Sequence, residues 1–337
     1  MKVLVIGGTR FIGPAVVRRL IARGHDVAVF HRGETRGELP ASVEHILGDR
    51  DRLSESRGAL IRFAPDVVIH NVVNNRTQID AAQEMFRGMA DRLVLVSSMD
   101  VYRAYGRLNG TEPGALEPMP IDESAPLREH LYPYRKHADD SSDPRWTYDK
   151  IPAERAVLDD EDLPGTVLRL PMVLGPGDYQ HRLYGLVQPM VDARRAIVLQ
   201  EGYAHWQSTY AHVTNVGEAI ALAATHEDAA GRIYNVADSA YSTLELGAIT
   251  ARTLGWDGEF VLLPPNELPD VLVVPWRAEQ SLVCRAERIR DELGYAPLLQ
   301  LEDAVHETVH WEKDHPPEAV AAERLHYEAQ NKVLGDL

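Results

Sequence analysis

Short runs of apolar residues alternate along the chain with longer segments whose apolar residues recur at helical spacing. The first run, Lys2 to Ile6, is rich in β-branched residues and is typical of a strand that is buried on both faces. The segment Phe11 to Arg23 places Ile12, Val16 and Leu20 on one side, which predicts a helix. The chain is therefore expected to begin with a strand, a turn and a helix.

The same alternation continues toward the C-terminus. Strands are predicted at residues 26–30, 43–47, 66–70, 92–97, 165–170 and 232–236. Helices are predicted at residues 54–63, 77–89, 152–158, 211–225, 244–254, 286–293 and 301–313. Strands separated by helices predict an α/β fold with a parallel, doubly wound sheet and right-handed crossovers. Residues 103–145, rich in proline and charge, predict a long loop, and residues 315–337 a polar helical tail.

Three glycines, Gly7, Gly8 and Gly13, surround the turn between the first strand and the first helix. A glycine-rich turn in this position aims backbone N–H groups and the helix N-terminus at a pyrophosphate. An ordinary tight turn also uses glycine. The strand directly before it and the helix directly after it favour a dinucleotide-binding site.

Composition is typical of a soluble globular protein, with 45% hydrophobic and 26% charged residues in a chain of 337. The single cysteine, Cys284, excludes an internal disulfide and favours a reducing compartment. The N-terminus shows no signal-peptide pattern, and no apolar run is long enough to span a bilayer. We therefore expect a cytoplasmic protein with no membrane partner.

Charge argues against nucleic acid as the main partner. The formal net charge is −16, from 35 basic and 51 acidic residues. A field of that sign repels phosphate backbones unless a local basic patch overrides it. We expect a small-molecule substrate instead.

Residues 7–13, GGTRFIG, resemble the G-x-x-G-x-x-G fingerprint of the extended short-chain dehydrogenases/reductases, a group that includes the NAD-dependent epimerases and dehydratases. Arg10 stands at the middle glycine position. That variant resembles the atypical branch, which includes the chloroplast stem-loop-binding proteins. Three later segments are also similar to segments of the family: residues 168–178, 211–216 and 285–297.

This resemblance implies a Rossmann-type domain and a smaller C-terminal substrate domain. The first would comprise residues 1–170 and 211–238, and the second residues 171–210 and 239–337. It also implies a homodimer and an oxidoreductase of the epimerase/dehydratase type. The expected step is hydride transfer at a carbinol or carbonyl carbon of a sugar-nucleotide-like or other polar small molecule. The alternative is a cofactor-binding protein without redox activity, either an RNA-binding relative or a dinucleotide sensor.

The residues after the second strand bear on the choice of cofactor. An acid there accepts a hydrogen bond from the ribose 2′-hydroxyl, whereas an arginine suits a 2′-phosphate. Here Arg32 follows the strand, no acid precedes Glu34, and Arg10 adds a second guanidinium. We therefore favour NADP over NAD. The residues expected to bind the cofactor are Gly7, Thr9, Arg10, Phe11, Ile12, Gly13, His31, Arg32, Asp49, Arg50, Asn71, Val72, Ser97, Lys150 and Pro171.

The expected catalytic residues follow the fifth strand and precede the helix at 152–158. Ser98, within S-x-x-V-Y, resembles the family's serine, which polarises the substrate oxygen. The family's acid/base is a tyrosine whose pKa is lowered by a lysine four residues on. Lys150 begins a segment similar to the family's K-x-x-x-E, but Trp146 stands four residues before it. An indole N–H cannot give up its proton at neutral pH.

Tyr148 is the proposed replacement for that tyrosine. Asp149 is the expected N-cap and Pro152 prefers the first helical turn, so the helix would start there and leave residues 146–148 extended. Tyr148 and Trp146 would then share a side, and Tyr148 would reach the nicotinamide. The alternative is that Tyr148 has a structural role and that another acid transfers the proton in the reaction. A literal Y-x-x-x-K at residues 132–136 is rejected because it lies too far upstream.

The residues expected to face the substrate are Tyr102, Trp146, Asp178, Arg182 and Gln207. Residues 306–310 spell H-E-x-x-H, the two-histidine zinc pattern of metalloproteases. We expect no metal there, because no third ligand is evident and the segment coincides with an ordinary C-terminal helix of the family.

Overall fold

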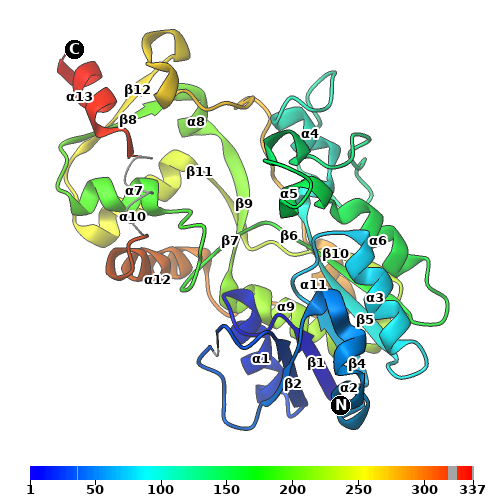
Figure 1. Ribbon diagram of the computed structural model, residues 1–337. Helices are drawn as coiled ribbons and strands as arrows, with labels where there is room; N and C mark the ends of the chain where they lie inside the picture. The colour runs from blue at the N-terminus through cyan, green and yellow to red at the C-terminus, as the bar shows by residue number, and fades with distance from the viewer. Residues whose placement is uncertain (36, 318–324, 336–337) are drawn as a thin grey trace.

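The computed structural model of the chain describes residues 1–35, 37–317 and 325–335 (Figure 1). Its strands are β1 (Lys2–Ile6), β2 (Asp26–His31), β3 (Glu44–Leu47), β4 (Val67–His70), β5 (Arg92–Ser98), β6 (Gly165–Leu170), β7 (Met172–Leu174), β8 (Ala196–Gln200), β9 (Gln207–His212), β10 (Arg232–Asn235), β11 (Ser239–Ser242) and β12 (Glu259–Leu263). Its α-helices are α1 (Ile12–Ala22), α2 (Arg57–Phe63), α3 (Arg76–Phe86), α4 (Arg103–Leu108), α5 (Pro144–Thr147), α6 (Lys150–Leu158), α7 (Tyr184–Val191), α8 (Glu201–His205), α9 (Val213–Thr225), α10 (Thr243–Leu254), α11 (Glu287–Leu293), α12 (Leu301–Asp314) and α13 (Tyr327–Gly335). The helical tail predicted at 315–337 includes α13, while its residues 318–324 and 336–337 lie outside the described residues.

The main sheet has seven strands in the order β10-β6-β5-β4-β1-β2-β3, and neighbouring strands are parallel throughout. The prediction of a parallel, doubly wound sheet is therefore confirmed. β1 pairs with both β2 and β4, so the chain leaves β1 toward one edge of the sheet and later returns to build toward the other. That reversal of strand order creates a crevice at the C-terminal ends of these strands.

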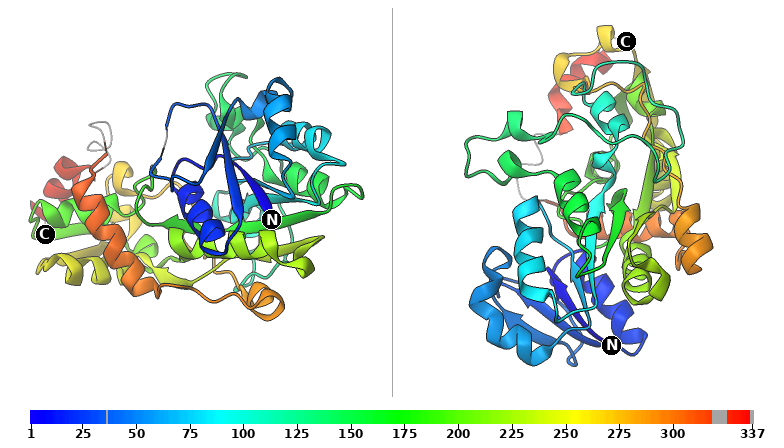
Figure 2. Two further views of the ribbon diagram at one scale, coloured as in Figure 1. Left: turned by 90° about the horizontal axis from the view of Figure 1, so that it is seen from below. Right: turned by 90° about the vertical axis from the view of Figure 1, so that its right-hand side faces the viewer.

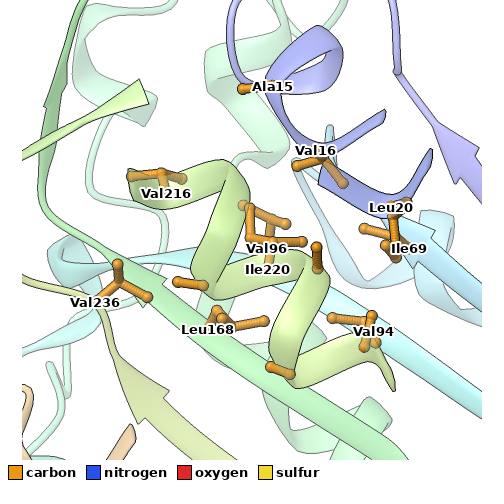
Figure 3. Close-up of a cluster of buried hydrophobic side chains, with 14 of the residues drawn as sticks. Ala15, Val16, Leu20, Ile69, Val94, Val96, Leu168, Val216, Ile220 and Val236 are labelled. Atoms are coloured by element: carbon orange, nitrogen blue, oxygen red, sulfur yellow. The ribbon is translucent and has the colours of Figure 1, made fainter. Parts of the chain in front are cut away.

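Helices cover both faces of this sheet, as the two views of Figure 2 show. Val3 and Val5 of β1 pack with α1 and α9 on one face. Leu4 and Ile6 pack with α2, α3 and α6 on the other. Figure 3 shows the first cluster, where side chains of α1 and α9 lie against residues of β4, β5 and β6. Each fully buried aliphatic side chain of this kind contributes about 1.5–3 kcal/mol through removal of apolar surface from water.

The chain leaves the main sheet directly after β6, where Pro171 alone separates β6 from β7. β7, β9 and β11 form a three-stranded sheet in the order β11-β9-β7, and β8 pairs with β12. These small sheets lie with α7, α8, α10 and α12 to the left of the main sheet in Figure 1. The strands of the main sheet come from residues 2–170 and 232–235. The exact domain boundaries stay a prediction.

The long excursion at residues 103–145 contains α4 and otherwise few regular elements. It is tied to a distant segment of the chain: the backbone N–H of Ile121 donates to the carbonyl of Val283 at 2.7 Å, and that of Arg285 donates to the carbonyl of Ile121 at 2.7 Å. Cys284 lies between these contacts, is buried, and has a free thiol whose pKa burial raises. Within the described ranges, no helix combines the length and apolar character needed to cross a membrane.

Acid should destabilise the fold through His70, the last residue of β4. Its side chain is 0% exposed, neither ring nitrogen has a hydrogen-bond partner in the protein, and burial lowers its pKa to about 3. Because its pKa in the unfolded chain is about 6.5, His70 binds a proton more readily when unfolded, so stability is lost as the pH falls below 6.5. By pH 5 this loss reaches about 2 kcal/mol.

Denaturant unfolding of the wild type and of His70→Leu at pH 7 and pH 5 measures this effect. We expect the free energy of unfolding of the wild type to fall by about 2 kcal/mol more than that of the variant. Equal falls in both proteins would show that His70 is not the group responsible.

Candidate active site

A cavity of about 480 Å³, named cavity A, lies at the C-terminal ends of β1, β2, β4 and β5. This is the place where the strand order reverses, at which open α/β sheets bind their ligands. Apart from Gly13, the residues predicted to bind a cofactor line it: Gly7, Thr9, Arg10, Phe11, Ile12, His31, Arg32, Asp49, Arg50, Asn71, Val72, Ser97, Lys150 and Pro171.

The glycine-rich turn fits closely against its neighbours. Gly7 has φ +86°, and a Cβ there would lie 2.5 Å from a side-chain carbon of Val72. A Cβ on Gly13 would lie 2.5 Å from the carbonyl carbon of Gly8 and 2.6 Å from the carbonyl oxygen of Gly7. Both are backbone atoms, which cannot move without changing the turn. Gly13 therefore does not line cavity A but allows α1 to begin against the turn.

Arg10, Arg32 and Arg50 bring positive charge to the lining of cavity A. Arg32 Nη2 donates to Glu34 Oε2 at 2.8 Å, and both side chains are largely exposed. An exposed ion pair of this kind adds little stability. The Arg32 guanidinium can therefore exchange the carboxylate for a phosphate at small cost.

Asn71 follows β4 and lines the same cavity. Its Nδ2 donates to the carbonyl of Gly7 at 3.1 Å, whereas its Oδ1 is buried and has no hydrogen-bond partner in the protein. A buried oxygen in this state is costly, and a donor on a bound ligand would satisfy it. The glycine turn, the arginines and this oxygen together fit a dinucleotide.

Lys150 begins α6, and Asp149 caps the helix as predicted by accepting from the backbone N–H of Ile151 at 2.9 Å. The Lys150 ammonium is buried and donates to the carbonyl of Val96 at 3.0 Å. Burial lowers its pKa to about 8. Lys150 Nζ lies over the ring of Tyr148, 5.9 Å from its centroid.

The prediction of an extended stretch at residues 146–148 is wrong for Trp146 and Thr147 and confirmed for Tyr148. Residues 144–147 form the short helix α5, which Asp143 caps with its side chain and which a proline begins. Trp146 therefore lies on a helix, is 37% exposed and lines neither of the two cavities described here. Tyr148 follows that helix in an extended conformation, and its side chain lines cavity A.

The hydroxyl of Tyr148 belongs to a chain of hydrogen bonds that ends at a buried carboxyl group. It donates to Asp100 Oδ2 at 2.8 Å. Tyr134 donates to the same oxygen at 3.3 Å, and the Tyr134 and Tyr105 hydroxyls are 2.7 Å apart. Burial raises the pKa of the Asp100 carboxyl. Burial, with the nearby Asp100 charge, raises the pKa of Tyr148 well above its usual value, so the expected lowering by lysine is reversed.

Asp100 is a site residue that the sequence analysis missed. Its Oδ1 is buried without a hydrogen-bond partner in the protein, and Arg128 Nε donates to its backbone carbonyl at 2.5 Å. The available signal was its position, two residues after a predicted catalytic serine at the end of β5. Its partner Tyr134 comes from the irregular excursion at residues 103–145, whose folding the sequence pattern does not indicate.

A second cavity, named cavity B, has a volume of about 770 Å³ and adjoins the first. Residues from α4, α7, β8 and β9 line it, together with residues 271–276 and three residues near the start of α13. The residues common to both cavities are Ser98, Tyr148, Leu170, Pro171 and Arg182. Ser98 and Tyr148 therefore stand where a molecule in cavity B would meet a dinucleotide in cavity A.

Of the residues predicted to face the substrate, Arg182 is placed at the cavities. Its Nη1 lies 2.6 Å from Oδ1 of the fully buried Asp178, which lines neither cavity and serves to hold the arginine. Gln207 is exposed at the start of β9 and also lines neither cavity. We therefore remove Asp178, Gln207 and Trp146 from the group that would touch a substrate.

Tyr102 is removed as well, because it is 0% exposed and lies within a buried polar network. Its hydroxyl donates to Asn235 Oδ1 at 2.7 Å and accepts from Arg169 Nη1 at 3.0 Å. Arg169 in turn pairs with Glu154 at 2.7 Å. The network joins β6, β10 and α6. Tyr102 therefore stabilises the packing of these elements beside the C-terminal end of β5, where Ser98 lies.

The H-E-x-x-H segment lies on α12, away from both cavities. Nδ1 of His306 is 2.6 Å from Oγ1 of Thr253. Among the residues that the structure describes, no three or more His, Cys, Asp or Glu side chains are grouped so that they could hold a metal ion.

The seven-stranded parallel sheet and its glycine-rich turn define a Rossmann-type dinucleotide-binding fold. The Epimerase family, described as the NAD dependent epimerase/dehydratase family, matches residues 3–237. The chain belongs to this family.

Known proteins similar to the chain differ in what their names say they do. A 3-diazoavenalumate denitrifying reductase from a Streptomyces species is 27% identical over 88% of this chain and 96% of its own length. The chloroplast stem-loop binding protein of 41 kDa b from Arabidopsis thaliana is 22% identical over 89% of this chain and 76% of its own length. The solved structure of dTDP-glucose 4,6-dehydratase from Bacillus anthracis in complex with NAD superposes with a TM-score of 0.68 at 19% identity, covering 94% of this chain and 97% of that one.

Proposed function

We propose that the chain is an NADPH-dependent reductase that acts on a carbonyl group of a small molecule in cavity B. The observation that carries the proposal is the meeting of the two cavities at Ser98 and Tyr148. The family supports a nicotinamide cofactor, and the similar Streptomyces protein is by name a reductase. Gly7, Arg10 and Asn71 would be among the residues that hold the dinucleotide in cavity A.

When bound, a reduced nicotinamide dinucleotide would supply the hydride for the carbonyl carbon, so the protein would have to supply one proton to the carbonyl oxygen. Ser98 Oγ accepts the backbone N–H of Asp100 at 3.2 Å. Its own O–H can therefore donate to the substrate oxygen and polarise the carbonyl. Tyr148 brings the second hydroxyl to this place, and we assign the proton transfer to it.

Tyr148 carries the proton that reduction of a carbonyl requires. Because burial and Asp100 raise its pKa, the hydroxyl keeps its proton near neutral pH and is an acid for reduction. Asp100 accepts the hydrogen bond of the Tyr148 hydroxyl and so orients it. Lys150, with a pKa of about 8, is mainly cationic at pH 7 and would stabilise the phenolate that remains after proton transfer.

Calorimetric titration with NADPH and NADH, after any carried-over nucleotide has been stripped, tests the cofactor part of this proposal. We expect NADPH to bind more tightly than NADH. Failure to bind either would contradict the proposal and favour a non-redox relative. Tight binding without turnover of any carbonyl compound would favour a dinucleotide sensor.

Replacing Arg32 by alanine should reduce the preference for NADPH. Removal of one guanidinium from a 2′-phosphate site is expected to weaken NADPH binding by about tenfold while NADH binding stays nearly unchanged. The matched control is Arg52→Ala, an exposed arginine that does not line cavity A. An equal loss of affinity for both cofactors would place Arg32 away from the 2′-phosphate.

A further inference from the structure

We infer that the substrate is a neutral, mostly apolar molecule that carries an aromatic ring system, and not a sugar nucleotide. This inference rests on the proposed function, because it identifies the occupant of cavity B. It replaces the sequence-based expectation of a sugar-nucleotide-like or other polar substrate.

One part of the wall of cavity B is built from aromatic rings. Trp276 lies with its ring centroid 4.9 Å from that of Trp206 and 5.6 Å from that of Tyr203, and all three residues line the cavity. The indole N–H of Trp206 donates to the carbonyl of Gln280 at 2.8 Å. The polar edge of Trp206 is therefore bonded within the protein, and the part of Trp206 that faces the cavity is mainly ring surface. Such a wall favours stacked or edge-to-face contact with another ring.

The end near the catalytic residues is aromatic as well. The rings of Tyr134 and Tyr148 lie 5.1 Å apart between centroids, and Tyr105 also lines the cavity there. Aliphatic side chains of β8 and of residues 271–274 also line the cavity. A ligand in cavity B would therefore meet extensive apolar and aromatic surface.

Three of the polar side chains that line cavity B form hydrogen bonds inside the protein, those of Gln200, Thr209 and Gln330. Gln330 Oε1 accepts from the backbone N–H of Val198 at 3.0 Å, and its Nε2 donates to a backbone carbonyl at 2.8 Å. Gln200 Oε1 accepts from the N–H of Val274 at 2.9 Å. Thr209 Oγ1 accepts a backbone N–H at 2.8 Å. Sugar hydroxyls buried here would lose water without gaining a matching set of partners, which costs free energy.

The small number of charged side chains in cavity B also favours a neutral substrate. Apart from His326, the ionisable acid and base side chains among the described lining residues are Asp100 and Arg182, besides the tyrosine hydroxyls. Arg182 is already paired with Asp178 at 2.6 Å. The two negative charges of a nucleotide diphosphate would therefore face one neutralised arginine and a nearby carboxyl group. Recognition of such an anion needs cationic groups or free backbone N–H donors.

The volume of cavity B, about 770 Å³, is in the range that takes a molecule of several rings. The reacting carbonyl would lie at Ser98 and Tyr148, and the ring system would extend toward Trp276. Compounds that carry a carbonyl or a carboxylate on the same ring system can therefore test whether cavity B prefers a neutral ligand.

Calorimetric titrations with 2-naphthaldehyde, 2-naphthoate and UDP-glucose test the inference, each without cofactor and with saturating NADP⁺, which cannot reduce the aldehyde. We expect the aldehyde to bind at least about tenfold more tightly than the isosteric carboxylate and UDP-glucose not to compete with it. Tighter binding of UDP-glucose or of naphthoate, or no binding of the aldehyde, would overturn the inference. Titrations without cofactor measure binding to cavity B alone. A protein that binds the aldehyde but not NADPH would therefore refute the proposed function and leave this inference standing.

Two variants place the bound aldehyde in cavity B. Trp276→Ala should weaken its binding by about tenfold, whereas Trp146→Ala, at an exposed tryptophan outside both cavities, should leave it unchanged. Val274→Asp puts a carboxylate into the half-buried wall and should also weaken binding by about tenfold, which keeps the test available if Trp276→Ala does not fold. Wild-type affinity in a folded Trp276→Ala or Val274→Asp protein would place the ligand elsewhere and refute the inference.

Discussion

Replacing Gly13 by alanine is expected to weaken NADPH binding by about 100-fold, equivalent to about 3 kcal/mol. The added Cβ would lie 2.5 Å from the backbone of Gly8 and 2.6 Å from that of Gly7. Relief of this overlap requires either the turn or the start of α1 to move. Both movements displace the backbone N–H groups that would hold the pyrophosphate. Calorimetric titration of the folded variant measures the loss.

Gly58→Ala is the matched control for this variant. Gly58 lies in α2, and a Cβ there would come no closer than 3.7 Å to any neighbouring atom. Alanine should leave NADPH affinity unchanged and stabilise the helix by about 0.5–1 kcal/mol. If Gly13→Ala bound NADPH as tightly as the wild type, the turn would not be the pyrophosphate site.

Replacing Tyr148 by phenylalanine should lower the turnover of a carbonyl substrate by about 100- to 10,000-fold, the usual contribution of a positioned acid. The change removes the hydroxyl that donates to Asp100 and leaves the ring over Lys150. NADPH affinity is therefore expected to change by less than about threefold. Steady-state kinetics together with calorimetry separate these two effects.

Tyr132→Phe is the informative comparison, because Tyr132 and Lys136 form the literal Y-x-x-x-K of the chain. Tyr132 lines neither cavity, and its ring lies under the guanidinium of Arg135 at 3.9 Å. We expect turnover close to that of the wild type. A large loss in Tyr132→Phe with none in Tyr148→Phe would reverse the assignment of the acid.

The main sheet and the position of cavity A could be predicted because both depend on local signals. Buried parallel strands such as Lys2–Ile6 are continuous apolar runs, and the glycines mark the turn that follows. The start of α6 could also be predicted, because Asp149 is an N-cap residue. Helix α5 carries the same kind of signal, because Asp143 is an N-cap residue and Pro144 follows it. That signal predicts a helix at residues 144–147 instead of an extended stretch.

The character of cavity B could not be predicted in the same way. Its walls combine residues far apart in the sequence, such as Tyr105, Tyr203 and Trp276. Each of these is an unremarkable aromatic residue in its own segment, and only tertiary packing brings them to one space. Asp100 was missed for a related reason: its partner Tyr134 reaches it from a stretch without periodicity.

The burial of Cys284 makes the chain suitable for site-specific labelling. It is the single cysteine, it is 7% exposed, and its raised pKa keeps the thiolate scarce, so a maleimide should leave it intact in the folded protein. A new cysteine at Val271, a 56% exposed residue that lines cavity B, would then be the one reactive thiol on the folded surface. An environment-sensitive dye attached there would report the entry of a ligand optically, without any need for turnover.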